Sequence, residues 1–380
     1  MKVVFLGCTD NYGLGFSANV TKIGYMAKGL TEAGAVCAIH NGIIGSTKVE
    51  KDQTATVDGF SVTTLMKRGN QLFSYVRNVR RLYRYLKSEK VDNEINLSIT
   101  TMPLFHIYFI YWFISKLLGY KFVVISHEWG PTLKSAKKVK YILLCLYAKV
   151  FGWFADAILP ISEYIIERIR HFNKPYFKVP ILAEFEKDSL IEVEKNNTFV
   201  YCAAVYFKRI ILMLIDAYKI YSEKGGGIML TLVLNGPEKL MAEIQGYIDN
   251  IGLNNKVVIK TKLPYDDLLN EYKKAIALII PLNPSYEQDE ARFSQKIAEY
   301  VSSGSAILTN KVGEISYYFK KDEFVACDFS EESFADAFKW IEFHNDDCTM
   351  IGRNGYRRGQ LDFNYKNVGK GLYEFLQILE

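Results

Sequence analysis

The sequence predicts an α/β protein built on two doubly wound, mostly parallel sheets. Short apolar runs alternate with helix-length amphipathic segments, which is typical of parallel strands joined by crossover helices. The chain has 380 residues, which is too long for one compact core. A polar stretch at residues 184–197 interrupts the alternation, so we expect a linker between two Rossmann-like domains.

The first half begins with a strand at residues 3–6, where one lysine and a short apolar run lead into a glycine turn. This pattern is unlike a signal peptide. Further strands are expected at residues 36–39, 61–65, 97–100, 122–126, 157–160 and 178–181. Helices are expected near residues 17–33, 72–88, 102–119 and 139–154. The 102–119 segment contains Pro103 and Lys116, so a buried or membrane-facing helix is favoured over a membrane span, which needs about 20 clean apolar residues.

The second half repeats the alternation. Strands are expected at residues 199–204, 230–235, 257–260, 277–281, 306–308 and 324–327. Helices are expected at residues 211–222, 238–251, 265–274, 295–303 and 331–343. The tail at 365–379 is helical and apolar on one face, so we expect it to pack on the first half. The predicted domains are residues 1–185 with 365–380, and residues 195–364.

Composition and cysteine usage indicate a globular protein in a reducing compartment. Hydrophobic residues make up 49% of the chain and charged residues 23%, which excludes a disordered chain. The six cysteines are scattered, without Cys-x-x-Cys pairs or His/Cys clusters at metal-ligand spacing. We therefore expect a cytoplasmic protein without structural zinc.

The net charge of +5 is unevenly placed. A predicted helix carries cations among aromatic and aliphatic residues, and a lysine cluster precedes the apolar 141–154 segment. The cations are Arg77, Arg80, Arg81, Arg84, Lys87 and Lys90, then Lys134, Lys137, Lys138 and Lys140. Such helices suit an anionic membrane surface, although a solvated helix face is the alternative. Nucleic acid is disfavoured because no recognition motif accompanies the charge.

One carboxylate stands out in the segment 290–316. Glu299 interrupts the apolar face of a helix that Ser294 can cap and Gly304 ends, before the strand at 306–308. Near the carboxyl ends of parallel strands, a carboxylate can hold the vicinal hydroxyls of a ribose. A solvated glutamate on an ordinary helix is the alternative.

Gly13 and Gly15 follow the first strand and precede a helix, so backbone amides there can face an anion. The dinucleotide pattern requires a glycine three places after Gly15, where Ala18 stands, and no acidic residue ends the second strand. A redox cofactor is therefore disfavoured.

Cationic residues and one histidine are candidates for chemistry. Lys208 and Arg209 follow the first strand of the second half and can neutralise a diphosphate leaving group, with Lys296 adding positive charge. His127 ends the 122–126 strand and can bond a sugar or carry a proton. No apolar run ends in Asp-x-Asp, so we expect neither a bound metal nor a cofactor.

Taken together, these segments resemble the retaining GT-B glycosyltransferases of the large family 4, the glycosyl transferases group 1 of bacterial surface polysaccharide synthesis. The resemblance covers most of the chain and is strongest at residues 203–319. The motifs that carry it are Gly13/Gly15, His127-Glu128, Pro160-Ile161-Ser162, Val205-Tyr206-Phe207-Lys208-Arg209, Leu234-Asn235-Gly236-Pro237, residues 277–281, and Lys296-Ile297-x-Glu299-Tyr300-x-x-x-Gly304.

By this resemblance, two Rossmann-like domains face each other across a cleft. Glu299 would bind the donor ribose, Lys208 and Arg209 the diphosphate, and His127 the transferred sugar. The turn with Asn235 and Gly236, the Gly13–Gly15 loop, Ser294 and Lys296 would complete the donor site. The sequence departs from the family pattern at two places. Ala291, one place after Glu290, stands where the family has its first glutamate, and no glycine precedes Lys208.

The implied activity is transfer of a sugar, with retention, from a nucleotide-diphosphate sugar to a glycan or lipid-linked acceptor. The leaving diphosphate would take the acceptor's proton, so no protein nucleophile is required. Two alternatives stay open: a nucleotide-sugar 2-epimerase, which would need more cleft carboxylates than the chain offers, and a non-catalytic scaffold of the same fold, which Ala291 favours.

Overall fold

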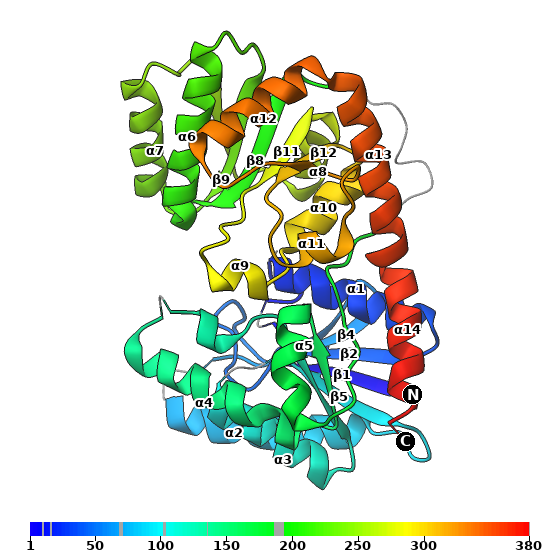
Figure 1. The fold of residues 1–380 in the computed structure, drawn as a ribbon. Helices are drawn as coiled ribbons and strands as arrows, with labels where there is room; N and C mark the ends of the chain where they lie inside the picture. Colours follow the sequence, from blue (N-terminus) through cyan, green and yellow to red (C-terminus); the bar gives the residue numbers. More distant parts are fainter. Residues whose placement is uncertain are drawn as a thin grey trace. The chain divides into compact units, whose positions relative to one another are not determined.

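The computed structural model describes residues 1–9, 11–15, 17–67, 71–101, 104–134, 136–185 and 194–379, which form two compact units (Figure 1). The first unit comprises Met1–Glu184, Ala291–Gln295 and Asp362–Glu380, and the second comprises Phe185–Glu290 and Lys296–Leu361. Most of the predicted linker, residues 186–193, lies outside the described residues.

The first unit is built on a seven-stranded sheet in the order β3-β4-β2-β1-β5-β6-β7. Neighbouring strands are parallel except β3 and β4, which form an antiparallel hairpin. The strands are β1 (Lys2–Leu6), β2 (Val36–His40), β3 (Gln53–Val57), β4 (Phe60–Thr64), β5 (Asn96–Thr100), β6 (Lys121–Ser126) and β7 (Ala157–Pro160). Its strand ends at Leu6, His40, Thr100 and Ser126 therefore meet at one edge.

Helices cover both faces of this sheet (Figure 1). The helices are α1 (Ala18–Glu32), α2 (Gln71–Glu89), α3 (Phe105–Leu117), α4 (Lys138–Phe154), α5 (Glu163–Ile169) and α14 (Tyr365–Gln377). On one face, β1 side chains such as Phe5 share a core with α1 and α14. A Cβ on Gly29 would lie 2.4 Å from the Tyr365 carbonyl oxygen, so the close packing of α1 on α14 requires glycine.

The second unit is built on a six-stranded sheet in the order β10-β9-β8-β11-β12-β13, with parallel pairs throughout. The strands are β8 (Thr198–Ala204), β9 (Met229–Asn235), β10 (Val257–Thr261), β11 (Ala277–Ile280), β12 (Ala306–Thr309) and β13 (Val325–Ala326). The helices are α6 (Lys208–Glu223), α7 (Glu238–Asn250), α8 (Tyr265–Lys274), α9 (Glu287–Ala291), α10 (Gln295–Ser303), α11 (Glu314–Tyr318), α12 (Glu331–Phe343) and α13 (Asn345–Asp362). The α6, α7 and α12 helices share the core on one face of the sheet.

Both sheets follow the predicted alternation, and the expected α/β fold class is confirmed. The strand predicted at residues 178–181 is wrong. This segment runs beside β7 through single bonds, such as the Val179 amide to the Pro160 carbonyl oxygen at 2.9 Å, and forms no strand. Pro175 precedes this segment and Pro180 lies within it, and proline cannot donate to a ladder.

Candidate active site

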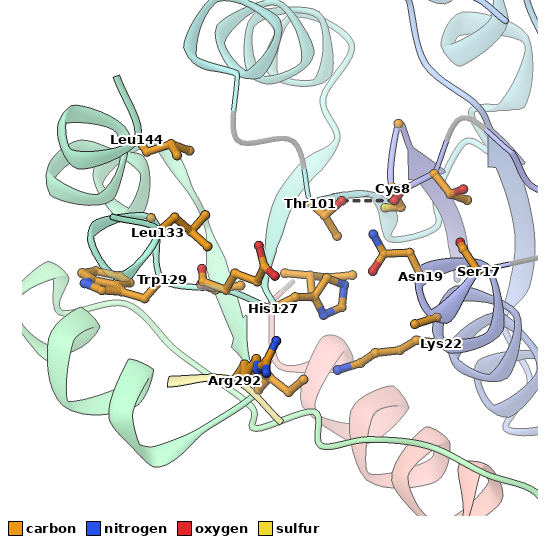
Figure 2. Close-up of a pocket in the computed structure, with 18 of the residues that line it drawn as sticks. Cys8, Ser17, Asn19, Lys22, Thr101, His127, Trp129, Leu133, Leu144 and Arg292 are labelled. Atoms are coloured by element: carbon orange, nitrogen blue, oxygen red, sulfur yellow. Dashed lines mark hydrogen bonds between the residues drawn. The ribbon is translucent and has the colours of Figure 1, made fainter. Parts of the chain in front are cut away.

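A cavity of about 620 Å³ opens at the carboxyl edge of the first sheet. The loops after β1, β2, β5, β6 and β7 line it, together with the first turn of α1 and residues 292–295 (Figure 2). These segments all belong to the first unit. Ligands of open α/β sheets bind at this edge because the loops there carry the variable side chains.

His127 lies in this cavity directly after β6, as its place in the sequence predicted. Its side chain is half-buried, and its Nε2 atom is buried without a hydrogen-bond partner among the described residues. Burial, and then the positive charge of Lys22, hold the pKa of His127 well below its usual value. The imidazole is therefore neutral at pH 7 and can exchange a hydrogen bond with a ligand.

Lys22 is a cavity residue that the sequence interpretation missed. It is 3% exposed, and its Nζ atom donates to the carbonyl oxygen of Val179 at 3.1 Å. Burial alone lowers its pKa to about 7, and no carboxylate in the described part of the chain acts against the shift. The sequence does contain a signal for this buried lysine, because Lys22 interrupts the apolar stripe of α1 that continues at Met26 and Leu30.

Residues 291–295 are anchored to the first unit. The Ser162 hydroxyl donates to the Ala291 carbonyl oxygen at 2.6 Å, and Gln295 exchanges hydrogen bonds with the backbone of Leu182. Ser294 and Arg292 therefore line the same cavity as His127. The sequence interpretation did not include Arg292, which no motif of this segment marks.

The Gly13–Gly15 loop lies beside this cavity but does not line it. Gly13 has a φ of 74°, and a Cβ there would meet the Val57 side chain at 3.0 Å. A Cβ on Gly15 would meet Lys48 Nζ at 3.0 Å. The lining backbone comes instead from Gly7 to Thr9 after β1 and from the first turn of α1, whose cap Ser17 accepts a hydrogen bond from the Val20 amide at 3.3 Å.

Glu299 occupies the second unit, on α10, where it is 8% exposed. Burial raises its pKa to about 7, against the opposing effect of Lys296. The neighbouring groups Cys202, Tyr272 and Tyr300 are neutral, because burial raises each pKa. Among the described residues, none hydrogen-bonds to the Glu299 carboxylate. A buried carboxylate with free acceptor oxygens is suited to hydroxyl donors from a ligand.

The two predicted diphosphate cations have different environments at the start of α6. Lys208 Nζ pairs with Glu243 Oε2 of α7 at 2.7 Å. Arg209 instead donates to the Tyr286 hydroxyl at 3.4 Å, in the loop after β11. Arg209 thus faces the segment that leads to Glu290, whereas Lys208 faces a surface carboxylate.

Asn235 and Gly236 form the turn after β9. Asn235 is exposed, and Gly236 has a φ of 147°. A Cβ on Gly236 would lie 2.2 Å from Val205 Cγ2, so glycine is required where this turn approaches the β8–α6 connection.

Glu290 is half-buried, and its Oε2 accepts a hydrogen bond from the Gly313 amide at 3.1 Å. Gly313 follows β12 and has a φ of 53°, and a Cβ there would lie 3.0 Å from the Glu290 carbonyl oxygen. Ala291, by contrast, is 1% exposed and faces the protein interior. Glu290 is therefore the carboxylate that this segment presents at the strand end.

Residues 183–358 match the family described as glycosyl transferases group 1. No curated protein sequence matches the chain significantly. Solved structures share the fold over its whole length. Sucrose-phosphate synthase from Thermosynechococcus elongatus is 13% identical, with a TM-score of 0.75 and coverage of 100% of this chain and 98% of that one.

HepE of Anabaena, in complex with UDP and glucose, is 12% identical, with a TM-score of 0.74 and full coverage of both chains. The lipopolysaccharide outer core galactosyltransferase WaaB is 15% identical, with a TM-score of 0.65 and coverage of 100% and 99%. The fold and the family match define the class: a glycosyltransferase with the GT-B fold. The protein is an enzyme whose second unit carries the glycosyl transferases group 1 domain.

Proposed function

We propose that the protein transfers a sugar, with retention, from a UDP-sugar to a glycan or lipid-linked acceptor in bacterial surface polysaccharide synthesis. The observation that carries the donor assignment is the environment of Glu299, a buried carboxylate within the family-matched region to which no described residue donates a hydrogen bond. Two hydroxyls of a ribose would satisfy it. Support for the uridine base comes from HepE, which is solved with UDP and with UDP-glucose.

The proposed chemistry needs positioning and charge stabilisation rather than a protein nucleophile. Arg209 stabilises the departing diphosphate, with Lys208 nearby at the first turn of α6. His127 is neutral and hydrogen-bonds the transferred sugar. The leaving diphosphate accepts the proton of the acceptor hydroxyl as the new glycosidic bond forms on the same face. The described residues contain no group of three His, Cys, Asp or Glu placed to hold a metal ion; metal independence is part of the proposal and is tested by adding EDTA.

The activity test is release of UDP from a panel of UDP-sugars, with and without a glycan acceptor. We expect acceptor-dependent release, and loss of about 90% or more of it in Glu299→Ala, because a hydrogen bond to a charged group contributes about 1.5–3 kcal/mol. Glu332→Ala, an exposed glutamate of the same unit, is the matched control. Conversion of the donor without acceptor would indicate an epimerase instead, and failure to bind any nucleoside diphosphate would indicate a scaffold.

We further propose that the acceptor is met at an anionic membrane surface. Described helices include none that is long and apolar enough to cross a bilayer. Exposed apolar side chains nonetheless line one face of α4 at helical spacing: Val139, Ile142, Leu143 and Leu146. Lys137, Lys138 and Lys140 flank this face. The support is the combination of an apolar stripe and adjacent cations, which binds lipid through both burial and charge.

Liposome co-sedimentation tests this surface. We expect salt-sensitive binding to vesicles containing phosphatidylglycerol and loss of binding in Leu143→Glu. The control is Ile378→Glu, which is 79% exposed at the end of α14. Equal sedimentation of both variants would contradict the proposed surface.

A further inference from the structure

We propose that Lys22 and Arg292 hold a phosphate group carried by the acceptor in the cavity of the first unit. The inference rests on the proposed glycosyltransferase function and names the chemistry of its acceptor. The ligand class is a sugar phosphate or a lipid-linked phosphate, and the shared feature is the phosphate.

Lys22 is buried in an environment that supplies it with no described anionic partner. Lys22 is 3% exposed, and its ammonium group donates to the neutral carbonyl oxygen of Val179. A buried cation without an anion is unfavourable unless a ligand supplies the charge. The pKa of Lys22, about 7, is lowered by burial alone, so none of the described carboxylates plays that part.

Lys22 and Arg292 converge on one place in the cavity. The side-chain ends of Lys22 and Arg292 point toward one another beside the His127 ring (Figure 2). They come from different elements, α1 and residues 291–295, so the hydrogen bonds of Ser162 and Gln295 that anchor the latter also fix the spacing of the pair. Arginine binds two phosphate oxygens through its planar fork, and lysine adds a point charge.

The ionisable side chains that line the cavity are mostly cationic. The lining residues include three cations, Lys22, Lys140 and Arg292, and one carboxylate, Glu128. His127 is neutral because its pKa is held low, and Cys8 stays protonated because burial raises its pKa to about 12. Asn19 in the first turn of α1 adds an amide to the lining, and the amino-terminal end of that helix favours an anion. The cavity is therefore cationic before any ligand enters.

We assign the phosphate to the acceptor because the groups proposed above for the ribose and the diphosphate of the donor, Glu299 and Arg209, are on the second unit within the family-matched residues. The experiment separates these two sources. Inorganic phosphate is titrated into the protein with UDP present at saturation, so that the donor site is filled, and binding is measured by isothermal titration calorimetry. UDP alone is titrated in parallel.

We expect wild-type protein to bind phosphate in the presence of UDP. Lys22→Met and Arg292→Gln should each weaken phosphate binding by about tenfold or more, since each removes a charge-assisted hydrogen-bond donor, while UDP affinity stays within about twofold. The matched controls are Lys28→Met, a surface lysine of α1 paired with Glu184, and Arg170→Gln, an exposed arginine of the same unit.

Three results would overturn the inference: no phosphate binding by the UDP-saturated wild type, unchanged binding in both variants, or equal loss of UDP and phosphate affinity, which would assign the cations to the donor diphosphate. Failure of the proposed function is a different result, because then UDP itself does not bind. Circular dichroism of each variant excludes loss of folding, and Lys22→Arg, which keeps the charge, should retain part of the phosphate affinity.

Discussion

Glu290 and Gly313 are joined by a hydrogen bond of 3.1 Å from the glycine amide to the glutamate Oε2. The bond places a carboxylate at the end of β12, although the residue that matches the family's first glutamate in sequence is Ala291. One oxygen of Glu290 is engaged with the backbone. We propose that Glu290 contacts the donor sugar in place of the family's first glutamate, one position before Ala291.

This relationship leads to a prediction for Glu290→Gln. The amide oxygen of glutamine can still accept from the Gly313 amide, so the melting temperature should stay within about 2 °C. The lost charge should lower kcat for sugar transfer about tenfold, because a charged acceptor is replaced by a neutral one. Initial rates and differential scanning calorimetry check both parts. A Glu290→Gln variant with wild-type kcat would exclude contact with the sugar, and Glu332→Gln, at an exposed glutamate of the same unit, is the control.

Arg209 and Lys208 should contribute unequally to donor binding. Arg209→Ala should lower kcat/KM for the UDP-sugar about tenfold or more, since a charge-assisted contact to the diphosphate is removed. Lys208→Ala should have a smaller effect, because Lys208 already pairs with Glu243 at 2.7 Å and is 40% exposed. Steady-state kinetics of the two variants provides the comparison, and the reverse order of effects would contradict the assignment.

Donor affinity should depend on the ionisation of Glu299. Its pKa is raised to about 7 by burial, and the ionised form accepts hydrogen bonds from ribose hydroxyls. Affinity for UDP-glucose, whose diphosphate does not titrate near neutrality, should therefore rise about tenfold between pH 6 and pH 8. The charged residue next to Glu299 is Lys296, and the nearby Cys202, Tyr272 and Tyr300 stay neutral over this range.

Calorimetric titrations at several pH values test this dependence. Glu299→Gln should bind more weakly and show a flat profile. An equally steep profile in that variant would assign the pH dependence to another group.

Lys22 should make folding stability depend on pH above neutrality. Its folded-state pKa of about 7 lies below the unfolded value, so the unfolded chain binds the extra proton between pH 7 and about 10. Stability therefore rises with pH across this window, with a slope of up to about 1.4 kcal/mol per pH unit from this one group. The penalty for the buried charge is fully present below pH 7.

The comparison with Lys22→Met isolates this effect. Lys195, whose pKa is about 8, titrates in both proteins and cancels in the difference. Urea unfolding at pH 7 and pH 9 should show that the free energy of unfolding of Lys22→Met exceeds that of the wild type by less at pH 9 than at pH 7. If this difference in the free energy of unfolding did not depend on pH, Lys22 would be solvated in the folded state.

The glycines of α13 should be required for packing. A Cβ on Gly352 would lie 2.3 Å from the Gly304 carbonyl oxygen, so Gly352→Ala should destabilise the protein by about 1–3 kcal/mol despite the better helix propensity of alanine. Gly246→Ala in α7 is the control, since nothing lies within 4 Å of its Cβ position. The control should stabilise by about 0.5–1 kcal/mol in thermal or urea unfolding. Similar changes in both variants would contradict the packing argument.

The elements that sequence patterns predicted well are those with strong periodicity. Helices at residues 265–274, 295–303 and 331–343 have the predicted bounds. Helix α13 was missed because Gly352, Gly355 and Gly359 weaken its helix propensity, yet each glycine allows close contact with the rest of the second unit. Tertiary packing thus decided a helix that local propensity disfavoured.

The hairpin of β3 and β4 was also missed, although its signal is local. Asp58-Gly59 connects the strands with positive φ angles of 52° and 82°, which is typical of a type I′ turn. Strand β3 lies at the sheet edge and is mostly exposed, so it has no apolar run to mark it.

The candidate site was predictable where a strand end carries a polar side chain, as at His127, or where a charge interrupts an apolar face, as at Glu299. Lys22 has the second signal and was overlooked. Lys22 and Arg292 are far apart in the chain but lie close together in the cavity. Their proximity depends on the hydrogen bond between Ser162 and Ala291, which no sequence spacing indicates.

The most direct test of the central claim is calorimetric titration of UDP into wild-type protein and Glu299→Ala. The account predicts saturable one-to-one binding by the wild type and affinity at least about tenfold weaker in the variant, with Glu332→Ala unchanged. Absence of UDP binding, or equal affinity in wild type and Glu299→Ala, would contradict the assignment of Glu299 as the carboxylate that holds the donor ribose.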